Sequence, residues 1–165
     1  MKVMIISDTH YPKKAKAIPK QVLRDLTNCD LLIHAGDWNT LDVFHELSRY
    51  TEVKGVFGNT DSQEIKDNFP ETLLLHLNGF NIGVIHGHGE KSTTEKRALR
   101  AFDSKQVDCI IYGHSHIPQL KKAESILLIN PGSATDKRRQ PYFSYCILTI
   151  EDSLGVNHIF YDDKS

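Results

Sequence analysis

Five short apolar segments of this sequence each end in aspartate, asparagine or histidine beside glycine or another small residue. In an open α/β sheet, ligands bind beyond the carboxyl ends of the strands, where a small residue lets the backbone turn sharply. The pattern therefore predicts one site that five strand ends build together. The polar sequences that follow the five segments are Asp8-Thr9-His10, Gly36-Asp37, Gly58-Asn59-Thr60-Asp61, His86-Gly87-His88 and Gly113-His114-Ser115-His116.

Nine apolar or β-branched segments predict the strands, and apolar residues at helical spacing predict the helices between them. Helices are expected within residues 15–28, 40–50 and 92–105, with Pro19 in or near the first turn of the first helix. The expected strands cover residues 2–7, 30–35, 52–58, 72–77, 80–86, 107–113, 125–130, 145–150 and 156–161.

The order of these segments predicts an α/β fold, a mixed sandwich of two sheets flanked by helices. Strand and helix alternate in the first half, which favours parallel pairing, whereas Asn78-Gly79 predicts a hairpin turn between two strands. A second hairpin is expected to turn between Lys121 and Ser125, and most of the C-terminal third is expected to be strand. A chain of 165 residues suffices for one domain, so residues 1–165 are expected to fold as a single unit.

Composition argues against several classes of protein. A formal net charge of -1 gives no general attraction to nucleic acid or to an anionic membrane surface, so neither partner is expected. No apolar run is long enough for a secretion signal or a membrane span, which favours the cytoplasm. Three separated cysteines, Cys29, Cys109 and Cys146, predict buried thiols rather than a disulfide framework or a thiolate zinc site.

The residue types at the five strand ends favour a pair of metal ions. Each short sequence alone is an ordinary turn motif, but five in succession are hard to explain as turns. Imidazole and carboxylate ligands without thiolate suit manganese, iron(II), zinc or nickel. Seven such ligands exceed what one tetrahedral ion uses, which favours two ions that share a carboxylate. Because the imidazoles must be neutral, metal binding should weaken as the pH falls through histidine titration.

In order and spacing, the five sequences resemble the motifs of the calcineurin-like metallophosphoesterases, in particular their small YfcE-type phosphodiesterase branch. The segment "LLINPGS" at residues 127–133 is also similar to that branch. The resemblance covers nearly the whole chain and implies a four-layer αββα sandwich.

The resemblance also implies a function and a ligand set. Two divalent ions, Mn²⁺ in the first place and otherwise Ni²⁺, Fe²⁺ or Zn²⁺, would hold a hydroxide that attacks a small soluble phosphodiester. Pairing of an exposed strand of the second sheet between subunits would give a homo-oligomer, although nothing in the sequence requires one. The implied ligands are Asp8, His10, Asp37 and His116 for one ion, and Asp37, Asn59, His86 and His114 for the other.

The chain departs from many phosphatases of the superfamily at Thr60, where they carry a histidine that donates a proton or binds phosphate. Without that imidazole, the site should favour better leaving groups or recruit another donor. His88 is the nearest substitute in the sequence, and a structural role is the alternative. Asp61 either orients a metal ligand or stabilises its own loop. Asn59 and His86 complete the residues expected to act in catalysis.

Other interpretations remain open at this stage. A retromer subunit that resembles this fold acts mainly as an interaction module, and a scaffold of that kind would be expected to have lost metal ligands. A protein phosphatase or a nuclease of the superfamily is disfavoured by small size, by Thr60 and by the absence of surplus basic charge. Trp38 and Asn39 are expected at the mouth of the site. The basic residues 137–139 either reach a substrate phosphate or form a solvated loop.

Overall fold

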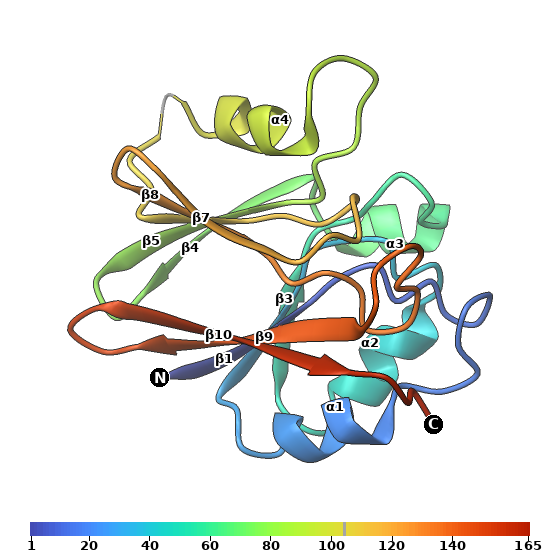
Figure 1. Ribbon diagram of the computed structural model, residues 1–165. Helices are drawn as coiled ribbons and strands as arrows, with labels where there is room; N and C mark the ends of the chain where they lie inside the picture. The colour runs from blue at the N-terminus through green and yellow to red at the C-terminus, as the bar shows by residue number, and fades with distance from the viewer. Residues whose placement is uncertain (104) are drawn as a thin grey trace.

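The computed structural model describes residues 1–103 and 105–165, and these form ten strands and four helices in two stacked five-stranded sheets (Figure 1). The first sheet has the order β10-β9-β1-β2-β3, with β1, β2 and β3 parallel and β9 antiparallel to both of its neighbours. Its strands are β1 (Lys2–Ile6), β2 (Leu31–His34), β3 (Glu52–Gly55), β9 (Phe143–Ile150) and β10 (Leu154–Tyr161).

The second sheet has the order β4-β5-β6-β8-β7, in which β5, β6 and β8 are parallel and the two edge strands are antiparallel. Its strands are β4 (Thr72–Leu77), β5 (Phe80–Ile85), β6 (Cys109–Ile111), β7 (Gln119–Ala123) and β8 (Ile126–Asn130). The helices are α1 (Lys20–Leu26), α2 (Leu41–Leu47), α3 (Gln63–Asn68) and α4 (Thr94–Ala101).

Alternation along the strands divides the core into layers. In β1, Val3 and Ile5 pack between the two sheets, whereas Met4 and Ile6 pack against the helices on the outer face. Successive side chains of a strand point to opposite faces, so one apolar strand serves both layers. Helix α4 covers the outer face of the second sheet, where Ala98 packs in a cluster with Ile110. The result is the expected four-layer αββα sandwich. Helices α1 and α2 cover the outer face of the first sheet, and α4 covers the outer face of the second (Figure 1).

The two predicted hairpins are confirmed. Asn78 and Gly79 join β4 to β5 with φ angles of 46° and 85°. Two successive positive φ angles are the mark of a type I′ turn, which Asn-Gly favours. Glu124, with φ of 54°, turns the chain between β7 and β8, inside the predicted interval.

One element, helix α3, was missing from the prediction. It has six residues and buries only Ile65, so it shows no helical period of apolar residues. Strand β7 was expected only as the first arm of the second hairpin, because it is an edge strand with the sequence QLKKA, whose exposed lysines hide the strand pattern. Several predicted elements were also too long. Helix α1 begins after its N-cap residue Pro19, and β3 ends at Gly55. Helix α4 spans 94–101 of the predicted 92–105, and residue 104 of that range lies outside the described residues.

We predict that Gly79→Ala lowers the free energy of unfolding by about 1–2 kcal/mol, because an L side chain at this positive φ is strained. No atom within 4 Å would meet the added Cβ, so the cost is conformational alone. Gly155→Ala is the matched control: its Cβ would meet Thr149 no closer than 3.9 Å, and the change should be neutral or slightly stabilising. Urea unfolding of both variants measures the difference, and equal stabilities would contradict the predicted turn strain.

Candidate metal centre

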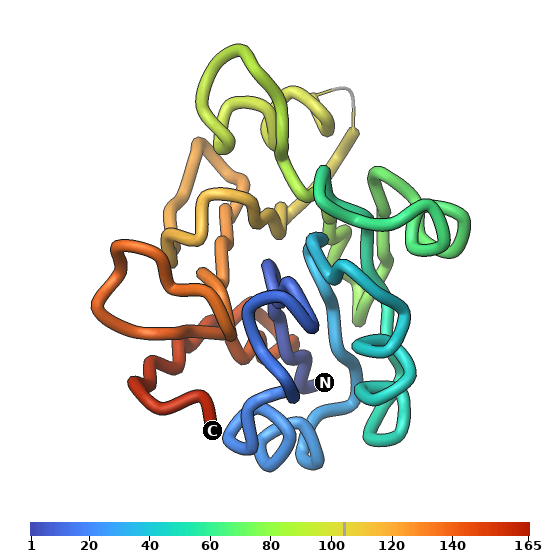
Figure 2. Tube along the Cα trace, turned by 90° about the vertical axis from the view of Figure 1, so that its right-hand side faces the viewer, coloured from blue at the N-terminus to red at the C-terminus, as the bar shows by residue number. Residues whose placement is uncertain are grey.

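The site lies where β1, β2, β5 and β6 end, on the right-hand side of Figure 1, which faces the viewer in Figure 2. Asp8 and His10 follow β1, Asp37 follows β2, His86 follows β5, and His114 and His116 follow β6. A left-handed backbone is uncommon for residues other than glycine and clusters at functional sites. Five of the predicted ligands have it, with φ of 54° at Asp8, 44° at His10, 59° at Asp37, 68° at His114 and 60° at His116.

A first group of ligand atoms joins Asp8, His10 and His116, whose donor atoms lie within 4.8 Å of one another. Oδ1 of Asp8 is 3.2 Å from Nε2 of His116 and 3.8 Å from Nε2 of His10. The two Nε2 atoms are 3.3 Å apart. All three side chains are buried, so water does not screen the charge of the carboxylate.

Hydrogen bonds on the far side of these imidazoles set which nitrogen faces the group. Nδ1 of His10 is 3.1 Å from Oδ1 of Asn39, and Nδ1 of His116 is 2.5 Å from the carbonyl oxygen of Asp136. Because both partners are acceptors, each Nδ1 donates its hydrogen, and each neutral ring turns the lone pair of Nε2 inward. Two lone pairs at 3.3 Å repel each other unless a proton or a metal ion lies between them. The pair is therefore built to hold a cation.

A second group joins Asp8, Asp37 and His86. Nδ1 of His86 donates to the carbonyl oxygen of Ala35 at 2.8 Å, so Nε2 is the free ligand atom. Nε2 lies 3.2 Å from Oδ2 of Asp37, and that oxygen is 3.6 Å from Nε2 of His10. Asp8 is common to the two groups, and Oδ2 of Asp37 lies between His86 of the second group and His10 of the first.

Two buried atoms of these groups, Oδ1 of Asp8 and Nε2 of His86, have no hydrogen-bond partner within the described part of the chain. A buried polar atom without a partner costs free energy, so its retention asks for an explanation such as an ion. Oxygen and imidazole nitrogen are donors that manganese, iron, nickel and zinc accept. The residues present therefore fit divalent metal ions.

The remaining predicted ligands lie farther out. The His114 ring is half-buried and meets the His86 ring edge to face at 5.2 Å between centroids, while the His114 backbone N–H donates to Oδ2 of Asp8 at 3.0 Å. Asn59 is exposed at the surface. The structure thus brings Asp8, His10, Asp37, His86 and His116 together, and the ligand roles of His114 and Asn59 stay predictions.

Asp61 connects two loops through backbone hydrogen bonds. Its carboxylate accepts from the N–H groups of Asp37 at 3.0 Å, Gly58 at 2.7 Å and Asn39 at 2.7 Å. Burial raises the pKa of Asp61, against the opposing effect of the Gly58 and Asn39 N–H groups. Both alternatives for Asp61 are thus present in one residue, since it stabilises its own loop and fixes the loop that carries Asp37.

The charges of the site favour a bound cation. Burial raises the pKa of Asp37, but the hydrogen bond and charge of His86 outweigh this and hold the carboxyl pKa below its ordinary value. Burial opposes protonation of His86, yet the charges of Asp8 and Asp37 raise its pKa to about 9. The same carboxylates that hold a proton on His86 would attract a metal ion in its place. Burial lowers the pKa of His114 to about 4, so this imidazole is neutral at physiological pH.

Comparison with known proteins agrees with this geometry. Residues 1–153 match the model of the calcineurin-like phosphoesterase superfamily domain. This chain belongs to that superfamily. A probable metallophosphoesterase of Methanocaldococcus jannaschii, MJ0623, is 37% identical over 160 residues, which are 96% of this chain and 81% of that protein. The phosphodiesterase MJ0936 of the same organism is 30% identical over 146 residues, 80% of this chain and 83% of that protein. The crystal structure of Vps29 complexed with zinc from Entamoeba histolytica is 25% identical with a TM-score of 0.76, covering 98% of this chain and 100% of that one.

In this member of the superfamily the segment "INPGSAT", residues 129–135, supports the loops that carry the candidate ligands. The Ser133 hydroxyl donates to the carbonyl of Asp8 at 2.7 Å, and the Thr135 hydroxyl donates to that of Thr9 at 2.5 Å. The side-chain amide of Asn130 donates to the carbonyl of Gly113 at 3.0 Å. These residues, together with Asn39 and Asp136, hold the strained backbone and the rings in place.

Trp38 was expected at the mouth of the site, and this was wrong. It is fully buried, stacks on His34 at 3.7 Å between ring centroids, and donates from Nε1 to the carbonyl of Val56. His34 uses both ring nitrogens, with Thr9 and with the N–H of Gly36. This pair supports the first layer of the core. Asn39, which was expected at the mouth as well, is also buried, with its Oδ1 beside His10, whereas Thr60 is exposed.

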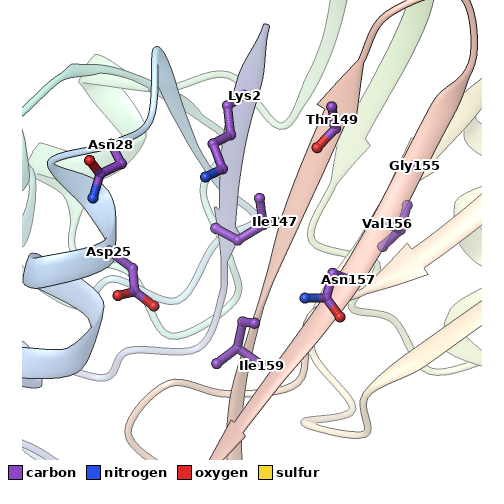
Figure 3. Close-up of a pocket in the computed structure, with 9 residues that line it drawn as sticks. All are labelled: Lys2, Asp25, Asn28, Ile147, Thr149, Gly155, Val156, Asn157 and Ile159. Atoms are coloured by element: carbon purple, nitrogen blue, oxygen red, sulfur yellow. The ribbon is translucent and has the colours of Figure 1, made fainter.

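A groove of about 620 Å³ lies elsewhere, beside α1, β9 and β10 (Figure 3). Lys2 at the start of β1 lines it, whereas Asp8 follows the other end of that strand. The groove contains no histidine and is separate from the candidate metal centre.

Within the described ranges, no helix has the length and hydropathy to cross a membrane.

We predict that Asp61→Asn lowers the free energy of unfolding by about 1–3 kcal/mol, because an amide cannot accept all three backbone hydrogen bonds. Manganese affinity should also fall, by roughly tenfold, since the loop that carries Asp37 loses its support. Thermal unfolding and metal titration measure the two effects. Asp152→Asn, on the exposed turn between β9 and β10, is the control and should change neither. An Asp61→Asn protein with wild-type stability and affinity would show that the loop does not depend on these bonds.

Proposed function

We propose that this protein is a dinuclear metal-dependent phosphodiesterase that hydrolyses a small phosphodiester. The observation that carries the proposal is the convergence of two buried ligand groups at the ends of strands from both sheets, with Asp8 common to the groups and Asp37 between His10 and His86. Asp8, His10, Asp37 and His116 would hold one ion, and Asp37, Asn59, His86 and His114 the other. The relative named as a phosphodiesterase supports the choice of diester.

When bound, two divalent ions, with Mn²⁺ as our first choice and Ni²⁺, Fe²⁺ or Zn²⁺ as alternatives, supply a hydroxide nucleophile and neutralise charge on the phosphoryl oxygens. The chain fixes the direction of its ligands. Asn39 and Asp136 hold the rings of His10 and His116 from behind, and Ala35 does the same for His86. Such second contacts set ring orientation and raise ligand basicity.

Thr60 supports the proposed preference for diesters. Its N–H donates to Oδ1 of Asp37 at 3.0 Å, and its hydroxyl lies 3.4 Å from Nδ1 of His10. A hydroxyl at this place cannot protonate a leaving group at neutral pH as an imidazole does. The site therefore suits esters that need little help from an acid.

His88 is our candidate for contact with the substrate. It is half-buried, its ring lies 5.6 Å from that of His86 and 6.5 Å from that of His114, and its buried Nδ1 has no partner in the described ranges. Because Nδ1 is buried, a contact with a substrate oxygen would be made by Nε2, on the side of the centre that carries His86 and His114.

A protein-interaction scaffold with little catalysis is the second candidate, because Vps29 shares the fold. The candidate ligands in this chain argue for the enzyme, since a scaffold does not need a buried cation site.

We predict that removal of metal by a chelator abolishes hydrolysis and that added manganese restores it, because the proposed nucleophile is a hydroxide that the metal ions would supply. Bis-p-nitrophenyl phosphate should be cleaved at least about tenfold faster, by kcat/KM, than p-nitrophenyl phosphate if the missing imidazole limits monoester cleavage. Release of p-nitrophenolate measures both. No activity with manganese, nickel, iron or zinc would favour the scaffold.

We predict that Thr60→His raises monoester hydrolysis by about 10²-fold or more, because it places an imidazole beside the centre. The exposed position should accept the larger side chain, and the backbone bond to Asp37 should persist. Thr60→Gln adds similar bulk without an acid and should give no gain. An unchanged ratio of diester to monoester cleavage in Thr60→His would contradict the role assigned to this position.

A further inference from the structure

A basic surface borders the candidate metal centre on one side. The loop between β1 and α1 and the loop after "INPGSAT" carry six exposed or half-buried cationic side chains, which we call the basic rim. Apart from Asp8, which is fully buried in the candidate metal centre, these loops contain one carboxylate, Asp136, although the whole chain has a net charge of -1. The rim consists of Lys13, Lys14, Lys16, Lys137, Arg138 and Arg139.

Direct contacts hold the two loops together and attach them to the centre. The Lys14 ammonium is 3.9 Å from a carboxylate oxygen of Asp136, and the Lys164 ammonium donates to the carbonyls of Lys14 and Thr135. The Lys14 N–H donates to the carbonyl of His10, and the carbonyl of Asp136 accepts from His116. The basic rim therefore stands beside the His10 and His116 pair.

Most of this charge is not neutralised by the protein. Within residues 1–103 and 105–165, no carboxylate lies within 4.0 Å of Lys13, Lys16, Arg138 or Arg139. Like charges gathered on two touching loops repel one another, and a bound anion relieves the repulsion. Arg138 is also held at φ of 49°, a left-handed backbone that arginine rarely adopts.

We propose that the basic rim binds a second phosphate group of the substrate, so that the preferred substrate is a small phosphodiester that also carries a terminal phosphate. This inference rests on the proposed function. The metal ions would hold the phosphate that reacts, and the rim, which lies outside the ligand set, meets the phosphate that does not. Arg138 and Arg139 offer the planar guanidinium donors that suit phosphate oxygens.

The test uses two probes that differ by one phosphate: thymidine 5′-(p-nitrophenyl phosphate) and the same compound with a 3′-phosphate. With manganese present, the wild-type protein should cleave the 3′-phosphorylated probe with the higher kcat/KM. Arg138→Ala should lower the ratio of the two kcat/KM values by roughly fivefold, mainly through KM, because it removes one exposed charged contact. Arg138→Lys should recover part of the ratio. Arg49→Ala, at the far end of α2, is the matched control and should leave the ratio unchanged.

A binding measurement separates this inference from the proposed function. Calorimetric titration should show tighter binding of thymidine 3′,5′-bisphosphate than of thymidine 5′-monophosphate, with the difference reduced in Arg138→Ala. If neither probe is cleaved but this difference remains, the phosphodiesterase proposal fails and the second phosphate site stands. Equal binding of the two nucleotides, or affinity that rises with the length of a single-stranded oligonucleotide, would overturn the inference.

Discussion

The hydrogen bonds behind the imidazoles are the constraint on which the site depends. His10, His86 and His116 each donate from Nδ1 to an oxygen, that of Asn39, Ala35 or Asp136. Each bond commits the opposite nitrogen to face the centre, where Asp8 and Asp37 concentrate negative charge. A ring free to turn would find its own partners and lose the lone pair that a metal ion requires. Rotation of these rings is thus prevented before any ion arrives.

The two sheets reach the same centre because their loops are joined at Asp8. Its Oδ2 accepts from the Ser7 hydroxyl and from the N–H of His114, which connects the end of β1 to the end of β6. An added Cβ on Gly113 would lie 2.0 Å from the Ser7 hydroxyl, so only glycine permits this approach. Between the sheets, Val3 and Ile5 pack in one cluster with Ile82 and Ile111. Burial of that cluster fixes the distance at which the loops meet.

The sequence predicted which strand-end residues lie together better than it predicted the residues that support them. Asp8, His10 and His116 follow the ends of strands, and apolar runs in the sequence mark where those strands end. Asp136 escaped notice because its contribution is a backbone carbonyl, which every residue type has. Trp38 was misplaced because its stacking on His34 depends on how the chain folds between the two residues, which no sequence pattern shows. Helix α3 was missed and the bounds of strand β7 were not found, since neither element buries enough apolar surface to leave a pattern.

Thr60 and the basic rim lie on separate loops, but both bear on how the site compensates for the missing acid. A site without an imidazole at Thr60 gives up transition-state help with the leaving group. Contacts to a phosphate that does not react can offset such a loss, since binding energy from remote groups orients the reacting centre. The rim borders His10 and His116, and the Thr60 hydroxyl also lies next to His10. The rim would select substrates that carry a second phosphate at the binding step, before hydrolysis. The metal ions would then need to recognise only the phosphoryl group that reacts.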